Sequence, residues 1–488
     1  MKSDRSLASP APCPPLSVFD MFKIGVGPSS SHTMGPWVAA AQFAEFLRPF
    51  HHAPENISIH LYGSLAKTGR GHGTDIAVQL GIQGFDVQTM DVQQIPTEIQ
   101  RISTQHFIHV AEWQISFDPK RDIVFHMDQQ LPAHPNGMRI VATMPDGNEQ
   151  SRRYYSVGGG FVVGDEPSEG NPARRTPPMP ISSAADLIRW CDETDSSIST
   201  VVMRNEANWE EAKRIDARLD KIRDTMLHCV HHGLIQRGTL PGGLNVQRRA
   251  AETADALLGS PIPTDFDHWM AGIRSHHRDR FEDTMDWVSC FALAVNEENA
   301  NFGRVVTAPT NGAAGVIPAV LMYRLFLCDS APNADTFDDL ARRFLMTASE
   351  IGAIFKKGST ISAAMGGCQA EIGVSSAMAA AALVESHGGS PRRCVEAAEV
   401  AMEHHLGLTC DPIGGLVQIP CIERNAFGAI KSIMAARMAL RRKTQTAIVS
   451  LDHVVQTMWQ TAQDMDARYK ETSEGGLATQ IAVNVSEC

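Results

Sequence analysis

The chain has 488 residues, of which 43% are hydrophobic and 20% are charged, so it is long enough for roughly two to four globular domains with ample cores. Its formal net charge of −12 argues against a nucleic-acid partner and against an anionic membrane surface. The ten cysteines form no dense framework, which is typical of a reducing cytoplasm rather than of a disulfide scaffold. We therefore expect a cytoplasmic globular protein.

The first residues and the longest uncharged stretch give no sign of a membrane segment. Residues 1–16 lack the apolar run of a secretory signal, and we expect them to form a disordered lead. The uncharged stretch 305–323 contains Pro309 and Pro318, which a lipid-exposed helix does not readily carry. We predict no transmembrane segment.

Helical and strand periodicities alternate between residues 17 and 163. Apolar spacing predicts helices over 35–50 and 74–80, and alternation at 57–61 predicts a strand that ends at a glycine-rich loop. Further strands are expected at 113–117, 122–127, 138–144 and 151–157, the last two joined as a hairpin across Pro145-Asp146-Gly147. This pattern predicts an α+β domain with a mostly antiparallel sheet.

Residues 164–181 are rich in proline, glycine and charge, and we interpret them as a linker. Strand signals almost vanish beyond Ser182, and glycine-rich breaks separate stretches of helical periodicity. The expected helices cover 183–194, 205–236, 245–258, 279–300, 313–328, 335–356, 370–386, 391–406, 425–441 and 448–466. The sequence therefore predicts a larger all-α domain over 182–488, whose loops converge on one site.

Three cysteines lie in loop-like surroundings. Cys368 follows two glycines, Cys410 precedes an Asp-Pro pair, and Cys421 follows a proline. A thiolate ligand needs a kinked backbone and nearby amide donors, whereas a structural cysteine normally replaces an aliphatic residue on a helix. The other cysteines in helical stretches are interpreted as small core residues: Cys191, Cys229, Cys290, Cys328 and Cys394.

The spacing of the three loop cysteines leaves their role open. Cys368 and Cys410 lie 42 residues apart, and Cys421 follows 11 residues later, which matches neither a zinc ribbon nor a ferredoxin. A metal or iron–sulfur site, a redox trio and no site at all remain possible. Cys488 is the last residue, so its thiol is either incidental or able to reach something. Three fixed ligands and one detachable ligand are typical of a catalytic metal centre, which needs an open position.

Hydroxyl groups gather before the first predicted helix. Ser29, Ser30, Ser31, His32 and Thr33 follow one another in the stretch GVGPSSSHTMGP. Helix capping explains one serine, whereas the whole run, together with free amides at a helix start, suits a carboxylate or another anion. We expect this run to bind substrate.

Two further loops are candidates for chemistry. His72 lies between glycines, so it is either a general base or a solvated loop histidine, and Lys67 nearby also permits a pyridoxal-phosphate interpretation. Thr310 and Asn311 lead into an Ala/Gly-rich helix, so they form either a carboxylate site or a tight turn. Lys356 and its neighbour are expected to be surface charges.

With these segments in view, the chain resembles the iron–sulfur-dependent L-serine dehydratases of bacteria, in their single-chain form. The similar segments, which include the unusual cysteine spacing and the terminal cysteine, are SVFDMFKIGVGPSSSHTMGP, GSLAKTGRGHGTD, LPGGLNVQRRA, AVNEEN, GRVVTAPTNGAAGVIPAV, GGCQAEIGVSSAMAAAAL, LTCDPIGGLVQIPCIERN, YKETSEGGLA and VNVSEC. Asn301-Phe302 before Gly303 and the tail TQIAVNVSEC depart slightly from the expected pattern.

The resemblance implies a 4Fe-4S cluster held by Cys368, Cys410 and Cys421, with Cys488 on the fourth iron in the resting enzyme. L-serine would displace the tail, and the iron would act as a Lewis acid on its hydroxyl. His72 would remove the α-proton, with pyruvate and ammonia as products. The family further implies a homodimer and a first domain that supplies Ser29 to Thr33 to the active site. We also expect Thr310 and Asn311, from their own loop, to bind substrate.

Two alternatives from other classes remain. A pyridoxal-phosphate lyase could perform the same elimination with Lys67 as the Schiff base, although it leaves the cysteine trio unexplained. A serine-binding regulatory protein would bind without turnover. Nor does the sequence decide whether His72 or His32 is the base.

Overall fold

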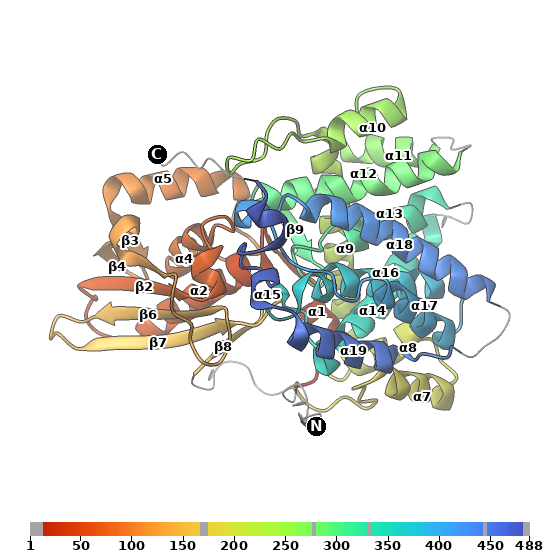
Figure 1. Ribbon diagram of the computed structural model, residues 1–488, viewed down its shortest axis with the longest axis horizontal. Helices are drawn as coiled ribbons and strands as arrows, with labels where there is room; N and C mark the ends of the chain where they lie inside the picture. The colour runs from red at the N-terminus through yellow and green to blue at the C-terminus, as the bar shows by residue number, and fades with distance from the viewer. Residues whose placement is uncertain (1–12, 166–173, 276–279, 329–333, 443–446, 482–488) are drawn as a thin grey trace.

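The computed structural model describes residues 13–165, 174–275, 280–328, 334–442 and 447–481. A body built around a sheet lies beside a larger helical body (Figure 1), and α1 (Val18–Met21) packs in the core of the helical body before the chain enters the sheet body. This arrangement confirms the predicted fold class. Most of the predicted lead, the middle of the predicted linker and Cys488 lie outside the described residues.

The main sheet of the first body has five strands in the order β5-β2-β6-β7-β8. The pairing of β2 with β5 is parallel and the other three pairings are antiparallel, so the sheet is mostly antiparallel as predicted. The predicted hairpin is β6-β7. The strands are β2 (Asn56–Tyr62), β5 (Ile123–His126), β6 (Gly137–Thr143), β7 (Glu149–Ser156) and β8 (Val162–Gly164).

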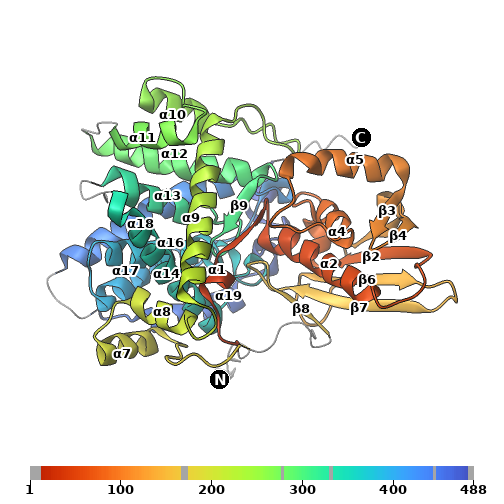
Figure 2. The same ribbon diagram turned by 180° about the vertical axis from the view of Figure 1, so that it is seen from behind.

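Helices α2 (Gly35–Leu47) and α4 (Thr74–Ile82) pack on each other beside this sheet, and Figure 2 shows both from behind. Phe43 and Leu47 of α2 are fully buried in the same core as the sheet residues Ile57 and Ile59. The sequence did not predict α5 (Ile95–Gln105) or β3 (Phe107–Val110), which pairs with β4 (Trp113–Ser116).

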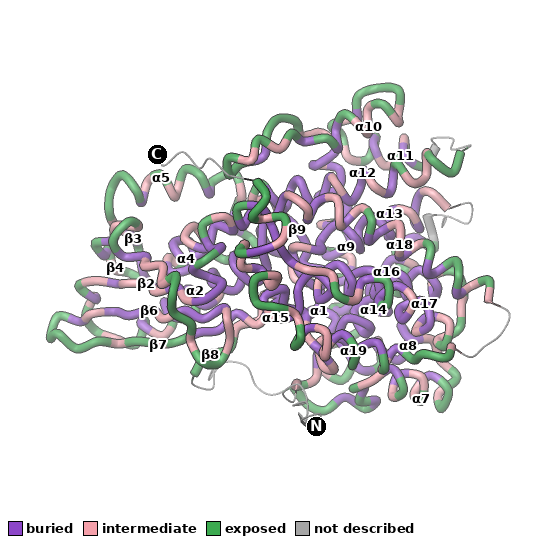
Figure 3. The backbone as a smooth tube through the Cα atoms, viewed as in Figure 1, coloured by how far each residue is buried: buried purple, intermediate pink, exposed green. Residues whose placement is uncertain are grey.

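The helical body surrounds α16, in which nearly every side chain is buried (Figure 3). Its alanines let α14, α17 and α18 approach closely, because small side chains permit short distances between backbones. The helices are α7 (Ala184–Thr194), α8 (Ile198–Glu206), α9 (Ala212–Ile235), α10 (Ala250–Leu258), α11 (Phe266–Ser275), α12 (Phe281–Ala300), α13 (Val316–Met322), α14 (Ala334–Gly358), α15 (Ala363–Gly366), α16 (Ile372–Ser386), α17 (Pro391–Glu403), α18 (Cys421–Arg441) and α19 (Leu451–Asp464).

Several predicted boundaries were wrong. The predicted helix 205–236 is divided between α8 and α9, because residues 207–211 leave the helix, and α11 was not predicted. The predicted helix 313–328 is α-helical only over α13 (Val316–Met322) and continues as a wider π-helical turn at Tyr323–Leu327. Cys191, Cys229, Cys290 and Cys394 are buried core residues as predicted, while Cys328 is half-buried.

A two-stranded sheet joins the two bodies. Strand β1 (Lys23–Val26) pairs antiparallel with β9 (Arg304–Thr307), although nearly 280 residues separate them in the chain. The Arg304 guanidinium donates to the carbonyls of Gly25 and Val87, which reinforces the junction. This pairing fixes the loop after β1 against the loop after β9, where the sequence placed candidate residues.

The expectation that Lys356 and Lys357 are surface charges was wrong. Lys356 Nζ lies 4.0 Å from the centre of the Phe161 ring, and Lys357 Nζ donates to the Ile181 carbonyl at 2.7 Å. Both side chains are half-buried, Lys356 against Phe161 at the seam between the two bodies and Lys357 against Ile181 on the helical side.

Among the described residues, no single helix has the length and apolar composition needed to cross a membrane. Within the described residues, one bent pair of helices, Ala363–Ala370 and Ile372–Ser386, has the necessary length and composition when the two are taken together. Its longer member, α16, is buried in the helical core.

The contact between α9 and α12 gives a first testable prediction. A Cβ atom on Gly233 would lie 2.3 Å from the Ala294 carbonyl oxygen, whereas a Cβ on Gly272 meets nothing within 4 Å. We expect Gly233→Ala to lower the free energy of unfolding by about 1–3 kcal/mol or more, because two helix backbones must separate. Thermal unfolding of Gly233→Ala and the control Gly272→Ala measures this, and equal midpoints would contradict the packing.

Candidate active site

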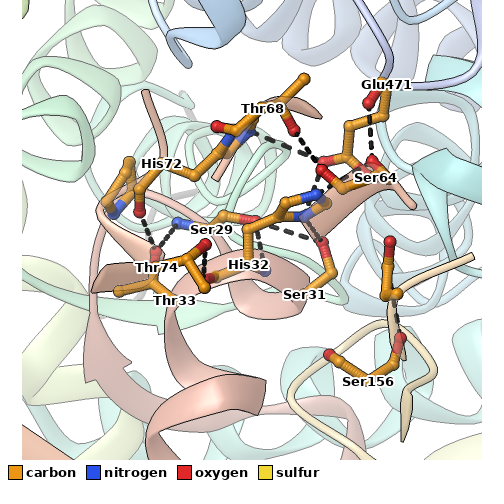
Figure 4. Close-up of polar contacts among 12 residues, drawn as sticks. Ser29, Ser31, His32, Thr33, Ser64, Thr68, His72, Thr74, Ser156 and Glu471 are labelled. Atoms are coloured by element: carbon orange, nitrogen blue, oxygen red, sulfur yellow. Dashed lines mark hydrogen bonds and ion pairs between the residues drawn. The ribbon is translucent and has the colours of Figure 1, made fainter. Parts of the chain in front are cut away.

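Loops from both bodies meet at one buried place. The turn after β1, the loop between β2 and α4 and a C-terminal segment converge there (Figure 4), and the cysteine loop before α18 lies against the second of these loops. The contact is close, because a Cβ on Gly71 would lie 2.7 Å from the Gly414 oxygen. Glycine at position 71 therefore lets the histidine loop lie directly on the cysteine loop.

The hydroxyl-rich run forms a π-helical turn, η1 (Ser30–Met34), in which every side chain is buried. Ser29 caps it, with Oγ accepting from the His32 amide at 3.1 Å. Ser29 and Ser31 hydroxyls lie 3.2 Å apart, and Ser30 is buried in the same turn. The run is thus a cap that also brings a histidine into the interior.

The two histidine loops are fastened to each other. Thr33 Oγ1 donates to the His72 carbonyl at 2.7 Å, and Thr74 Oγ1 donates to the His32 carbonyl at 2.6 Å. The two rings stack with centres 4.5 Å apart. Both imidazoles are therefore held in fixed positions by the backbone, as Figure 4 shows.

The hydrogen bonds of His72 define its tautomer. Nδ1 lies 2.9 Å from the Thr68 carbonyl oxygen, which can only accept, so Nδ1 carries the hydrogen and Nε2 presents a lone pair. Burial lowers the pKa of His72 to about 4, so the ring is neutral at pH 7. A buried, neutral and oriented imidazole is equipped to accept a proton.

His32 has both ring nitrogens engaged. Nε2 lies 3.0 Å from Ser64 Oγ, and the Ser64 hydroxyl donates to the Glu471 carbonyl at 2.7 Å, so Nε2 is the nitrogen that donates to Ser64. Nδ1 then accepts from Ser31 Oγ at 2.9 Å. Burial holds the pKa of His32 well below its usual value. Because both nitrogens of His32 are used, His72 has the more accessible lone pair.

Glu471 is a site residue that the sequence did not single out. Its Oε1 lies 3.5 Å from His32 Nδ1 and 3.7 Å from His72 Nε2, and its side chain is buried. Burial and the neighbouring Glu371 carboxyl hold the pKa of Glu471 well above its usual value. The segment YKETSEGGLA carried the family resemblance, but nothing local distinguishes this glutamate from the exposed Glu474 three residues later.

A segment that we call the C-terminal strap, residues 466–477, holds Glu471 in place. The Glu471 amide donates to the Cys410 carbonyl at 3.0 Å, and the Leu477 amide donates to the Asp411 carboxylate at 2.9 Å. Glu471 adopts φ +57°, a left-handed conformation that non-glycine residues rarely take. The strap thus links the carboxyl to the cysteine loop.

The three loop cysteines are buried together. Cys368 lies in the short helix η4 (Gly367–Ala370), Cys410 precedes the turn η5 (Ile413–Gly415), and Cys421 is the first residue of α18. Ligand atoms of Cys368, Glu371 and Cys410 all lie within 4.8 Å of one another. A hydrogen bond from Cys410 and the nearby Arg424 guanidinium lower the pKa of the Cys368 thiol despite its burial.

This donor set fits a thiolate-bound cluster. Sulfur ligands are the ones that iron–sulfur clusters require, and Arg424 supplies a half-buried positive charge beside Cys368 and Cys421. Arg424 is itself oriented by the Thr409 carbonyl at 2.6 Å and by the Asp411 carboxylate at 3.1 Å. Such outer contacts are the support that metal ligands need.

The loop after β9 has a more structural setting. Asn311 Nδ2 donates to the Val26 carbonyl at 3.0 Å, and its Oδ1 accepts from Thr307 at 2.8 Å, so this side chain fastens the junction of the two bodies. Thr310 is buried beside Glu371 and lowers the pKa of that carboxyl, which burial raises to about 7. Thr310 is therefore the residue of this pair that lies nearer to the cysteine site.

The junction of the α+β body and the helical body holds buried imidazole, carboxyl and thiol groups. Such a site, built from both bodies of one chain, is typical of an enzyme. Comparison with known proteins gives its family. The model for the serine dehydratase beta chain matches residues 17–167, and the model for the serine dehydratase alpha chain matches residues 193–478. The chain belongs to the serine dehydratase family.

Curated relatives are similar over nearly the whole chain. The L-serine dehydratase of Mycobacterium bovis is 46% identical over 478 residues, which covers 97% of this chain and 100% of the relative. L-serine dehydratase 1 of Escherichia coli is 44% identical over 477 residues, which covers 96% of this chain and 99% of the relative. The L-serine dehydratase of Helicobacter pylori is 40% identical over 482 residues, with 95% and 98% covered.

Proposed function

We propose that the protein is an L-serine dehydratase, which converts L-serine to pyruvate and ammonia. The observation that carries the proposal is the neutral His72 imidazole, whose free Nε2 lies at the buried junction with three cysteine thiols. The names of full-length relatives support the same substrate. A β-elimination needs a base for the α-proton and help for the departing hydroxyl, and these two kinds of group meet here.

Each residue has a part in this scheme. A 4Fe-4S cluster held by Cys368, Cys410 and Cys421 would supply a Lewis acid for the departing hydroxyl. His72 Nε2 accepts the α-proton, while its Nδ1–H stays on the Thr68 carbonyl. The loss of water leaves an enamine, which tautomerises to an imine, and water then replaces its nitrogen to give pyruvate and ammonia.

The rest of the proposal follows the family resemblance. We infer that Ser29, Ser31 and Thr33 shape the substrate pocket, that Cys488 is the detachable fourth ligand, and that the protein is a cytoplasmic homodimer. The hydrogen bonds of Ser29 and Thr33 support a role in positioning the histidines.

The alternatives are weaker. Lys67 is exposed and its Nζ lies 2.6 Å from Glu474, so it is not aimed at the buried histidines as a Schiff-base lysine would need to be. A regulatory protein that binds serine without turnover would not need a neutral, oriented base beside thiols. Formation of pyruvate from L-serine would rule out this regulatory alternative.

The test is an anaerobic absorbance spectrum with iron and sulfide analysis, followed by a pyruvate assay on the same sample. We expect a brown protein with about four irons per chain that makes pyruvate from L-serine and loses activity in air. A colourless or aldimine-yellow protein that is active in air would overturn the cluster proposal. Serine binding without any pyruvate would favour the regulatory alternative.

A further inference from the structure

We propose that the Glu471 carboxyl binds the α-ammonium group of the substrate and thereby restricts the enzyme to amino acids. This inference rests on the proposed L-serine substrate and assigns a specificity role to a residue of the C-terminal strap. It is carried by the position of the carboxyl, by its surroundings and by an unused oxygen atom.

The carboxyl is buried without a cationic partner. Among the described residues, its ion-pair contacts are with two imidazoles, His32 and His72, which burial keeps neutral. The neighbouring Glu371 carboxyl opposes its ionisation, while hydrogen bonds from Ser31 and from the Ala364 backbone favour the charged form. Buried carboxyls without a counter-ion are costly, and a bound ammonium group would supply the missing charge.

One oxygen of this carboxyl is unused. Glu471 Oε2 is buried and has no hydrogen-bond partner in the described part of the chain, although buried polar atoms nearly always have one. The side chain is only 4% exposed. An ammonium group has three donors and no acceptor, so it can satisfy this atom without adding an unpaired acceptor.

The distances suit an α-amino acid. An ammonium nitrogen hydrogen-bonded to the Glu471 carboxyl lies next to His72 Nε2 without needing the lone pair of that nitrogen. The α-hydrogen of an amino acid lies two bonds from its nitrogen, so the ammonium acceptor and the base must be close neighbours. The separation of 3.7 Å between Glu471 Oε1 and His72 Nε2 meets that requirement.

The strap places this carboxyl on the cysteine side of the pocket. The Glu471 amide donates to the Cys410 carbonyl, so the strap holds this residue against the backbone of the cysteine loop. The same two imidazoles and carboxyl could instead hold a divalent metal ion, whose ligands lie about 2.0–2.2 Å from it. The separations from Oε1, 3.5 and 3.7 Å, suit such an ion, but His32 Nδ1 already accepts from Ser31, so the ion would have to displace that hydrogen bond.

The test compares Glu471→Gln with the control Glu474→Gln, which changes an exposed carboxyl of the same strap. On anaerobic protein with equal iron content, KM for L-serine and the inhibition constant of 3-hydroxypropanoate, which lacks the amino group, are measured. We expect Glu471→Gln to raise KM by about 10- to 100-fold and to leave the inhibition constant of 3-hydroxypropanoate within about twofold, because only the ammonium contact is lost. Glu474→Gln should change neither.

Other results would overturn the inference. A fall in kcat with KM unchanged would make Glu471 a proton-transfer group, and equal weakening of both ligands would make it a structural residue. A second metal beyond the cluster, present in the parent protein and absent from Glu471→Gln, would identify a metal site instead. If Glu471→Gln loses its iron, Glu471→Asp provides the same comparison with the charge retained.

The ammonium site can be tested separately from the proposed dehydratase activity. If the parent protein makes no pyruvate, equilibrium dialysis with L-serine and 3-hydroxypropanoate still compares the two variants. Selective loss of L-serine binding in Glu471→Gln would then support the ammonium site without the dehydratase activity, and unaltered binding would contradict it.

Discussion

Replacing Cys421 by serine should remove bound iron and reduce pyruvate formation by more than about 100-fold. Cys421 opens α18, and its thiol lies in the field of Arg424 one turn later, beside Cys368. A serine hydroxyl has nearly the same size but is a much poorer ligand for iron than a thiolate, so the change removes a donor without opening a cavity. Iron and sulfide analysis of anaerobically purified protein measures the first effect.

The matched control is Cys290→Ser. Cys290 is fully buried in α12, and its thiol donates to the Ala250 carbonyl at 3.2 Å, a contact that a hydroxyl reproduces. Burial raises the pKa of this thiol well above its usual value, so it has no thiolate character at neutral pH. Iron content and activity should both be retained. Loss of iron in the control, or a full complement of iron in Cys421→Ser, would remove Cys421 from the ligand set.

The sequence predicted the parts of this site that carry local signals. The three cysteines stand in unusual glycine- and proline-rich surroundings, and His72 lies between glycines, so each could be recognised from its neighbours. The run from Ser29 to Thr33 was recognised as a substrate-binding and capping stretch for the same reason, and the structure uses it as a cap.

What the sequence did not predict depends on distant contacts. Glu471 gains its role from His32, which is more than 400 residues away, and β1 can be recognised as a strand only when β9 is beside it. The predicted helix 205–236 ran through residues 207–211, where the chain leaves the helix, and it missed most of α8. Lys356 looked like a surface residue because its burial against Phe161 is created by the seam between the two bodies.

His72→Gln should lower kcat by about 100- to 10,000-fold while the iron content stays that of the parent protein. The imidazole is buried, and only its Nδ1–H is used, on the Thr68 carbonyl, so the change removes the free Nε2. His32→Gln should behave differently. That ring supports Ser64 and Ser31, so its loss disturbs the positions of neighbouring groups and should raise KM along with any change in kcat. His109→Gln, on the exposed face of β3, is the control.

The pH dependence separates His72 from the nearby carboxyls. A base acts in its unprotonated form, and burial lowers the pKa of His72 to about 4, so this form is complete at neutral pH and is lost only as the pH falls through about 4. We therefore expect kcat for L-serine, which reports the complex in which the Glu471 carboxyl already holds the ammonium group, to stay constant on the acid side down to the pH at which the protein loses iron or unfolds. A limb centred near pH 7 would contradict this expectation and would point to Glu371, whose pKa burial raises to about 7.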